Sequence, residues 1–120
     1  MIQLAPQMKI VAAIEPVDFR RGIDGLAQVC KDVLKHDPFN GWVFVFRNRS
    51  ATALKILVYD GQGFWLCHKR LSSGKFRWWP SAKNSAGKTL PSHQMHVLLS
   101  AGNPEATQAA PAWRPVGPVD

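Results

Sequence analysis

The stretch L-K-I-L-V-Y-D-G-Q-G-F-W-L-C-H-K-R-L, residues 54–71, decides the fold class of this chain. It contains two runs rich in large apolar residues, 54–59 and 64–71, and the connection between them begins with Asp60 and Gly61. Asp-Gly is a strong turn signal between two such runs. Residues 54–71 are therefore predicted to form an antiparallel β-hairpin.

Three further runs extend the predicted sheet. Residues 42–47 are large or β-branched, and residues 76–79 end at Pro80, which cannot donate a hydrogen bond to a strand ladder. A short apolar run at residues 9–14, stopped by Pro16, is predicted to be the first strand. The short loops after residue 42 favour an antiparallel meander.

Helical periodicity marks two segments. Between residues 18 and 36, apolar side chains recur at spacings of four, three, four and three, which places them on one face of an α-helix: Phe19, Ile23, Leu26, Cys30 and Val33. Asp18 is predicted to be the N-cap of this helix, and Asp37 with Pro38 its stop. Pro91 is predicted to open a second helix.

These elements predict one α+β domain over residues 1–102, in the order β-α-β-β-β-β-α. We expect an antiparallel sheet of about four to five strands with both helices packed on one face. Residues 103–120 are rich in Pro and Ala with little apolar bulk, and we expect a disordered tail.

The net charge of +7 is concentrated in one region. Residues 47–88 carry nine Lys or Arg side chains, interleaved with aromatic rings, and one carboxylate, Asp60. Positive charge combined with Trp is typical of surfaces that bind polyanions, and DNA or RNA is the first candidate. A basic face that only aids solubility would have the same composition.

Strand alternation predicts where this charge lies. One sheet face is expected to be apolar and covered by the helices, and the other to mix Arg, Lys and Tyr with aliphatic residues as a half-exposed recognition face. Trp42 and Trp65 are expected in the core. Of the adjacent Trp78 and Trp79, one is expected to be buried and the other exposed.

Five phrases, in this order and spacing, resemble one family. They are D-F-R-R-G-I-D-G-L-A at 18–27, D-P-F-N-G-W-V-F-V-F-R-N-R at 37–49, K-I-L-V-Y-D-G-Q-G-F-W-L at 55–66, K-R-L-S-S-G-K-F-R-W-W-P at 69–80 and Q-M-H-V-L-L-S-A-G at 94–102. Over about residues 8–102 the chain is similar to the small TnpB-type accessory proteins of bacterial insertion-sequence-66 elements. These are distinct from the much longer RNA-guided nucleases that share the TnpB label. After Gly102 the sequence departs from the usual ending of the family.

The resemblance implies a non-enzymatic accessory factor in transposition, encoded beside a larger transposase that holds the catalytic carboxylates. Its expected partners are DNA at the element ends, the transposase and the other accessory protein of the element, with a homo-oligomer left open. The positions expected to contact DNA are Arg20, Arg21, Arg47, Arg49, Lys55, Lys69, Arg70, Lys75, Arg77 and Trp78. An adaptor for the transposase without direct specific DNA binding is the alternative, because Trp and Arg also anchor protein interfaces.

Three patterns that suggest catalysis have simpler explanations. Residues 82–89, A-K-N-S-A-G-K-T, satisfy a relaxed phosphate-loop pattern but lack the strand before it and the helix after it. Glu15 and Asp18 are too few carboxylates for a metal pair, and Asp18 is better explained as a helix cap. His93 and His96 share a helix face with no Cys pair nearby. No catalytic residue, metal or cofactor is predicted.

Compartment and redox state follow from what the sequence contains. No run approaches the ~20 apolar residues of a membrane span, and the first residues show no signal-peptide pattern. We expect a cytoplasmic, nucleoid-associated bacterial protein with no membrane partner. Cys30 and Cys67 are expected to be free thiols that behave as small hydrophobes.

Overall fold

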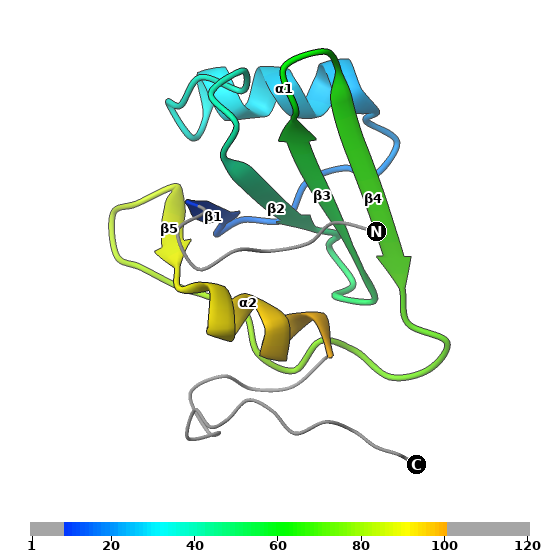
Figure 1. The fold of residues 1–120 in the computed structure, drawn as a ribbon. Coiled ribbons are helices and arrows are strands. Elements are labelled where there is room, and N and C mark those ends of the chain that lie inside the picture. Colours follow the sequence, from blue (N-terminus) through cyan, green and yellow to red (C-terminus); the bar gives the residue numbers. More distant parts are fainter. Residues whose placement is uncertain (1–8, 101–120) are drawn as a thin grey trace.

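The computed structural model describes residues 9–100, which form five strands and two helices. In chain order these are β1 (Ile10–Ala13), α1 (Ile23–Asp32), β2 (Val43–Arg47), β3 (Ala53–Tyr59), β4 (Phe64–Arg70), β5 (Gly87–Leu90) and α2 (Ser92–Leu99). The strands make one sheet in the order β4-β3-β2-β1-β5 (Figure 1). The predicted α+β class is confirmed. The tail predicted at residues 103–120 lies outside the described residues.

The β3–β4 hairpin forms as predicted. Its strands pair without interruption from Ala53 opposite Arg70 to Tyr59 opposite Phe64. Asp60 holds the turn, because its Oδ1 accepts hydrogen bonds from the backbone N–H groups of Gln62 (2.9 Å) and Gly63 (3.0 Å). Gly61 adopts a left-handed conformation (φ 99°), which explains the Asp-Gly signal in the sequence.

The sheet is mixed rather than purely antiparallel. β1 runs parallel to β2, with Ile10 opposite Val43, and antiparallel to β5, with Ile10 opposite Leu90. A parallel pair needs a long crossover connection, and α1 supplies it between β1 and β2. The antiparallel meander predicted after residue 42 is therefore correct for β2, β3 and β4, whereas the expectation of a purely antiparallel sheet is wrong for the pair of β1 with β2.

The prediction of a strand at residues 76–79 is wrong. The strand that lies between β4 and α2 along the chain is β5, residues 87–90. The chain leaves β4 at one edge of the sheet and must reach the opposite edge beside β1, a path of about 20 Å at ~4.8 Å per strand. Residues 71–86, here called the crossing segment, cover this path (Figure 1). Within it Phe76 is buried, and Trp78 and Trp79 pack against the same core cluster. These side chains fill the sheet face and form no strand of their own.

The two helices lie on opposite faces of the sheet, so the expectation that they share one face is wrong. Ile10 and Ala12 belong to the core cluster that contains the buried side chains of α2 and the crossing segment, namely Met95, Leu98 and Phe76. Val11 and Ala13 point the other way and belong to the cluster built on α1, which contains Leu26, Val29 and Cys30. Both faces of β1 and β2 are therefore buried.

Helix α1 is shorter than the segment 18–36 predicted from its periodicity. It begins after Gly22, which makes no side-chain cap hydrogen bond, so Asp18 is not its N-cap. The carboxylate of Asp18 instead accepts hydrogen bonds from the backbone and guanidinium of Arg20. At the other end the chain turns away at Lys35, whose φ is 60°. Helix α2 begins directly after Pro91, in agreement with the prediction.

We predict that Leu26→Ala lowers the free energy of unfolding by about 2–5 kcal/mol. Leu26 is fully buried between α1 and the sheet, so the substitution removes apolar contacts and leaves a cavity. Chemical denaturation followed by circular dichroism measures this change. A loss below about 0.5 kcal/mol would contradict the packing of α1 described above.

Candidate nucleic-acid interface

Five exposed cationic side chains gather at one end of the sheet. They come from the β2–β3 turn, from the end of β4 and from the start of the crossing segment, and we call them the basic end: Arg49, Lys69, Arg70, Lys75 and Arg77. None of residues 48–52 or 69–77 is acidic. The nearest carboxylate along the hairpin, Asp60, lies at its other end, about 20 Å away for a strand of this length.

Backbone hydrogen bonds bring these segments together. The N–H of Leu71 donates to the carbonyl of Thr52 (2.9 Å), and the N–H of Phe76 donates to the carbonyl of Ala51 (2.8 Å). Phe76 is buried, so the residues on either side of it, Lys75 and Arg77, are left exposed at the surface. The start of the crossing segment is thereby fixed against the β2–β3 turn.

The turn that carries Arg49 is itself rigidly held. Asn48 Oδ1 accepts hydrogen bonds from the N–H groups of Thr52 (2.9 Å) and Ala53 (3.1 Å), and its amide donates to Thr52 Oγ1 (3.0 Å). Lys69, on the neighbouring strand end, donates through Nζ to the carbonyl of Leu99 in the last turn of α2. Cations are favoured at a helix C-terminus, so this contact also orients Lys69.

Lys55, one of the positions expected to contact DNA, lies away from the basic end. Its side chain is 7% exposed on the α1 side of the sheet. Nζ donates to the carbonyls of Phe19 (2.9 Å) and Arg21 (3.1 Å) and lies 4.9 Å from the centre of the Phe19 ring. Lys55 therefore ties the loop before α1 to β3.

Arg47 is likewise occupied within the protein. Its guanidinium donates to the carbonyl of Ile14 (3.0 Å) and lies 5.6 Å from the centre of the Trp79 ring, and its Nε is buried without a partner among residues 9–100. Trp79 donates through Nε1 to the carbonyl of Ala13 (2.8 Å). Trp78 and Trp79 are both half-buried against one cluster, so the expected division into one core and one exposed ring is wrong. Without a strand at residues 76–79, neighbouring side chains are not forced to opposite faces.

The predicted recognition face of the sheet does not exist as such. Lys55 and Ala53 share a strand face with Leu57, which belongs to the α1 cluster, and Arg70 pairs with Ala53 on that face. Lys69 pairs with Leu54, which belongs to the α2 cluster on the other face. Cationic side chains are thus divided between the two faces. They come together at the end of the sheet, where the strands stop.

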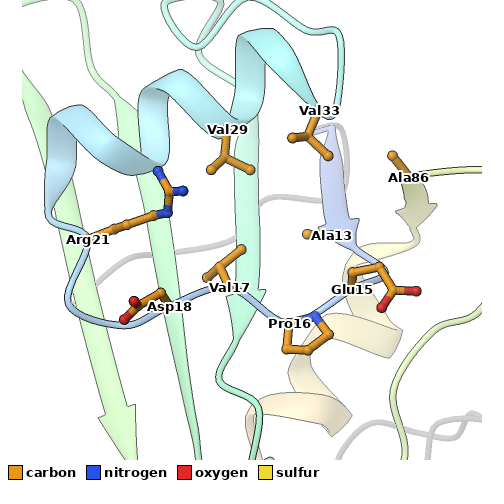
Figure 2. Close-up of a pocket in the computed structure, with 9 residues that line it drawn as sticks. All are labelled: Ala13, Glu15, Pro16, Val17, Asp18, Arg21, Val29, Val33 and Ala86. Carbon is orange, nitrogen blue, oxygen red and sulfur yellow. The ribbon is translucent and has the colours of Figure 1, made fainter.

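Arg20 and Arg21 lie in the loop before α1. Arg20 is paired with Asp18, with 2.6 Å between Nη2 and Oδ2, and this hydrogen bond holds the pKa of Asp18 at about 2. Arg21 lines a pocket of about 300 Å³ between this loop and α1. Figure 2 shows Val29 of α1 above Val17, and Val33, which follows α1, above Ala13, with Arg21 and Glu15 at the two ends of the pocket. Asp18 is neutralised by Arg20, so Glu15 and Asp18 do not form a pair of free carboxylates.

Two large aromatic side chains are exposed near the turn of the hairpin. Trp65 on β4 is 57% exposed, which contradicts its predicted place in the core, and its Nε1 donates to Asp60 Oδ2 (2.7 Å). Phe39 is 56% exposed and packs against Tyr59 and Phe64 (ring centres 5.0 and 5.1 Å apart). Trp42 is half-buried against the α1 cluster. The apolar residues around Trp65 suggested that it is buried. It is exposed because β4 lies at the edge of the sheet, and the order of the strands cannot be deduced from the local sequence.

The described residues contain little that resembles catalytic machinery. Within residues 9–100 no three His, Cys, Asp or Glu side chains gather closely enough to hold a metal ion. Lys88 and Thr89 of the phosphate-loop-like phrase lie in β5, whereas a phosphate loop requires a helix at that point. Cys30 is fully buried, and burial raises the pKa of its thiol to about 12, which disfavours the reactive thiolate.

The fold and the basic end define a small α+β protein with a regional cationic surface. Comparison with known proteins places it more narrowly: residues 8–109 match the family described as IS66 Orf2 like protein, and the chain belongs to that family. It is 38% identical over 118 residues to the uncharacterized protein y4hO of Sinorhizobium fredii, covering 96% of each chain. It is 39% identical over 102 residues to the uncharacterized protein y4jC of the same organism, covering 85% of each chain. No solved structure matches.

Membership in this family indicates an accessory role in transposition, and the resemblance seen in the sequence is confirmed. In the part of the chain that the structure describes, neither helix is long and apolar enough to span a membrane.

We predict that Lys55→Met destabilises the fold by about 1–3 kcal/mol, because two carbonyl groups lose their donor while the apolar stem is kept. Thermal and denaturant unfolding measure this effect. The same variant should retain the DNA affinity of the unaltered protein. A variant of full stability that has lost DNA affinity would instead place Lys55 on the binding surface.

We also predict that the Cys30 thiol reacts with an aromatic disulfide reagent only as fast as the protein unfolds. Its burial and raised pKa both withhold the thiolate. The measurement is the reaction rate of Cys67→Ser, in which Cys30 is the remaining thiol, with and without denaturant. Rapid reaction without denaturant would show that α1 does not cover Cys30 as described.

Proposed function

We propose that this protein is a non-enzymatic accessory factor in the transposition of a bacterial insertion element, and that it binds DNA through the basic end. Family membership supports the link to transposition. The observation that carries the DNA-binding proposal is the convergence of exposed Arg and Lys side chains from three chain segments that hydrogen bonds hold together.

The composition of the basic end suits contact with phosphates. Arg and Lys supply charge-assisted hydrogen bonds to phosphate oxygens, and residues 48–52 and 69–77 contain no acidic residue of their own. Fixed backbone positions lower the cost of ordering the side chains on binding. Phosphate contacts are independent of sequence, so recognition of the element ends also requires some of these side chains to reach base edges.

A second candidate is an adaptor that docks on the transposase without binding DNA itself. The exposed rings of Phe39 and Trp65 favour it, since aromatic residues are enriched in protein interfaces. In either case the protein would act in the bacterial cytoplasm, at the nucleoid, with the element ends, the transposase and the second accessory protein as its partners.

The test is fluorescence anisotropy with a labelled duplex of the element's terminal repeat and a scrambled duplex of equal length, titrated from low to physiological salt. We expect binding that weakens with salt, with the repeat preferred at physiological salt. Arg49→Ala/Lys75→Ala/Arg77→Ala should weaken binding and reduce the slope of log K against log salt by about one for each phosphate that the variant no longer binds. These three side chains are exposed, so the fold should remain cooperative.

The matched control is Lys31→Ala/Lys83→Ala/Lys88→Ala, which removes the same charge from exposed positions outside the basic end. It should keep most of the affinity and nearly the full salt slope. Equal losses in both triple variants would show that only net charge matters and would refute the assignment of the interface. Binding that disappears at physiological salt for both duplexes would favour the adaptor.

A further inference from the structure

Strand β4 has a free hydrogen-bonding edge. It is the first strand in the sheet order β4-β3-β2-β1-β5, and among residues 9–100 no strand pairs with its outer side. Leu71 N–H donates to Thr52 and Asp60 N–H donates to Gly63, which fixes the odd-numbered residues of β4 as those that bond to β3. The backbone groups of the even-numbered residues therefore point outward: Phe64, Leu66, His68 and Arg70.

This edge lacks the usual protection over most of its length. β4 pairs with β3 along its whole extent without a bulge, and it contains no Pro. The other edge strand, β5, has four residues, whereas β4 has seven. Long, regular edge strands are ready templates for pairing with another strand. Charged residues guard one end of β4, at Lys69 and Arg70, and aromatic residues occupy the other.

The two ends of β4 are complementary to each other. The C-terminal end carries Lys69 and Arg70, and the N-terminal end carries the rings of Phe64 and Trp65 beside the carboxylate of Asp60. Hydrogen bonds from Gln62, Gly63 and Trp65 lower the pKa of Asp60 and so favour its charged form. A strand with a cationic end and an aromatic, acidic end matches a second copy of itself in the antiparallel orientation. Parallel pairing would instead set the cations of the two copies side by side.

We propose that two copies of this chain pair antiparallel along β4, with Cys67 facing Cys67 of the second copy at the two-fold axis. This register uses the full strand, because outward-facing Phe64 meets Arg70 and Leu66 meets His68. It also places Trp65 opposite Lys69, whose Nζ is held by the carbonyl of Leu99, so that the apolar stem of the lysine lies against the ring. The two sheets then form one continuous sheet, with both α2 helices on the same side.

The register makes a chemical prediction that other modes of association do not. Cys67 belongs to the residues that bond to β3, so across the dimer it forms a non-hydrogen-bonded pair, with Cα atoms about 4.5 Å apart. That distance lies within the range a disulfide can bridge. Cys30, the other cysteine of the chain, is buried under α1 and serves as an internal control.

The test uses the full chain without DNA, so its outcome is separate from that of the DNA-binding proposal. Sedimentation equilibrium over a dilution series should give a dimer, and mild oxidation with copper–phenanthroline should give a covalent dimer that a reductant dissolves. Cys67→Ser should abolish the covalent product, and Cys30→Ser should retain it. A monomer at all concentrations, or a dimer that cannot be linked through Cys67, would overturn the proposal.

Edge variants test the backbone pairing directly. His68→Pro removes an outward N–H that β3 does not use, so it should abolish the dimer and the Cys67 link, whereas His68→Ala, the matched control, should keep both. If His68→Pro fails to fold cooperatively, Trp65→Lys takes its place, since it sets a Lys against Lys69 of the second copy and should weaken association about tenfold or more. A folded His68→Pro or Trp65→Lys variant that associates like the unaltered protein would overturn the proposal.

Discussion

Burial of β1 and β2 on both faces is the constraint on which the rest of the structure depends. All four residues of β1 are apolar and buried, with Ile10 and Ala12 on one face and Val11 and Ala13 on the other. Neither face of this strand can be exposed to water, so both need apolar cover. Helix α1 covers one side, and the crossing segment with α2 covers the other. The same cover positions the basic end: Phe76 packs into the core, and its neighbours Lys75 and Arg77 remain in solvent beside the β2–β3 turn.

Local chemistry allowed most of the elements to be predicted, whereas their arrangement could not be. The Asp60-Gly61 turn, the periodicity around Leu26 and Pro91 at the start of α2 are determined within a few residues, and each was found in the sequence. The parallel pairing of β1 with β2 and the placement of the helices on opposite faces depend on contacts between distant segments. Strand β5 was missed because Gly87 and Lys88 have low strand propensity, and its pairing with β1 decides its conformation.

The placement of the cationic side chains was predicted in part for the same reason. Composition located the cationic region correctly, and five of its side chains do converge at one end of the sheet. Lys55 and Arg47 donate hydrogen bonds to backbone carbonyls and contact aromatic rings inside the fold. Their charge alone did not distinguish them from the exposed Lys75 and Arg77. Strand periodicity predicted on which face of the sheet Lys55 lies. It could not predict that α1, from another part of the chain, covers that face. The exposure of Trp65 likewise follows from the edge position of β4.

The pairing of β1 with β5 has a consequence for synthesis of the chain. Ala13 of β1 pairs with Gly87 of β5, so β1 cannot complete its pairing until β5 has emerged from the ribosome, some seventy residues later. Until the crossing segment and α2 have been made, a nascent chain that has already formed the βαβ unit and the hairpin exposes Ile10, Val43 and Val45 on its uncovered side. At a translation rate of about 5–20 residues per second, this apolar surface remains open for several seconds. This apolar side of the sheet is the surface that a chaperone would meet during synthesis, and a chain truncated before residue 90 lacks the cover of α2 there.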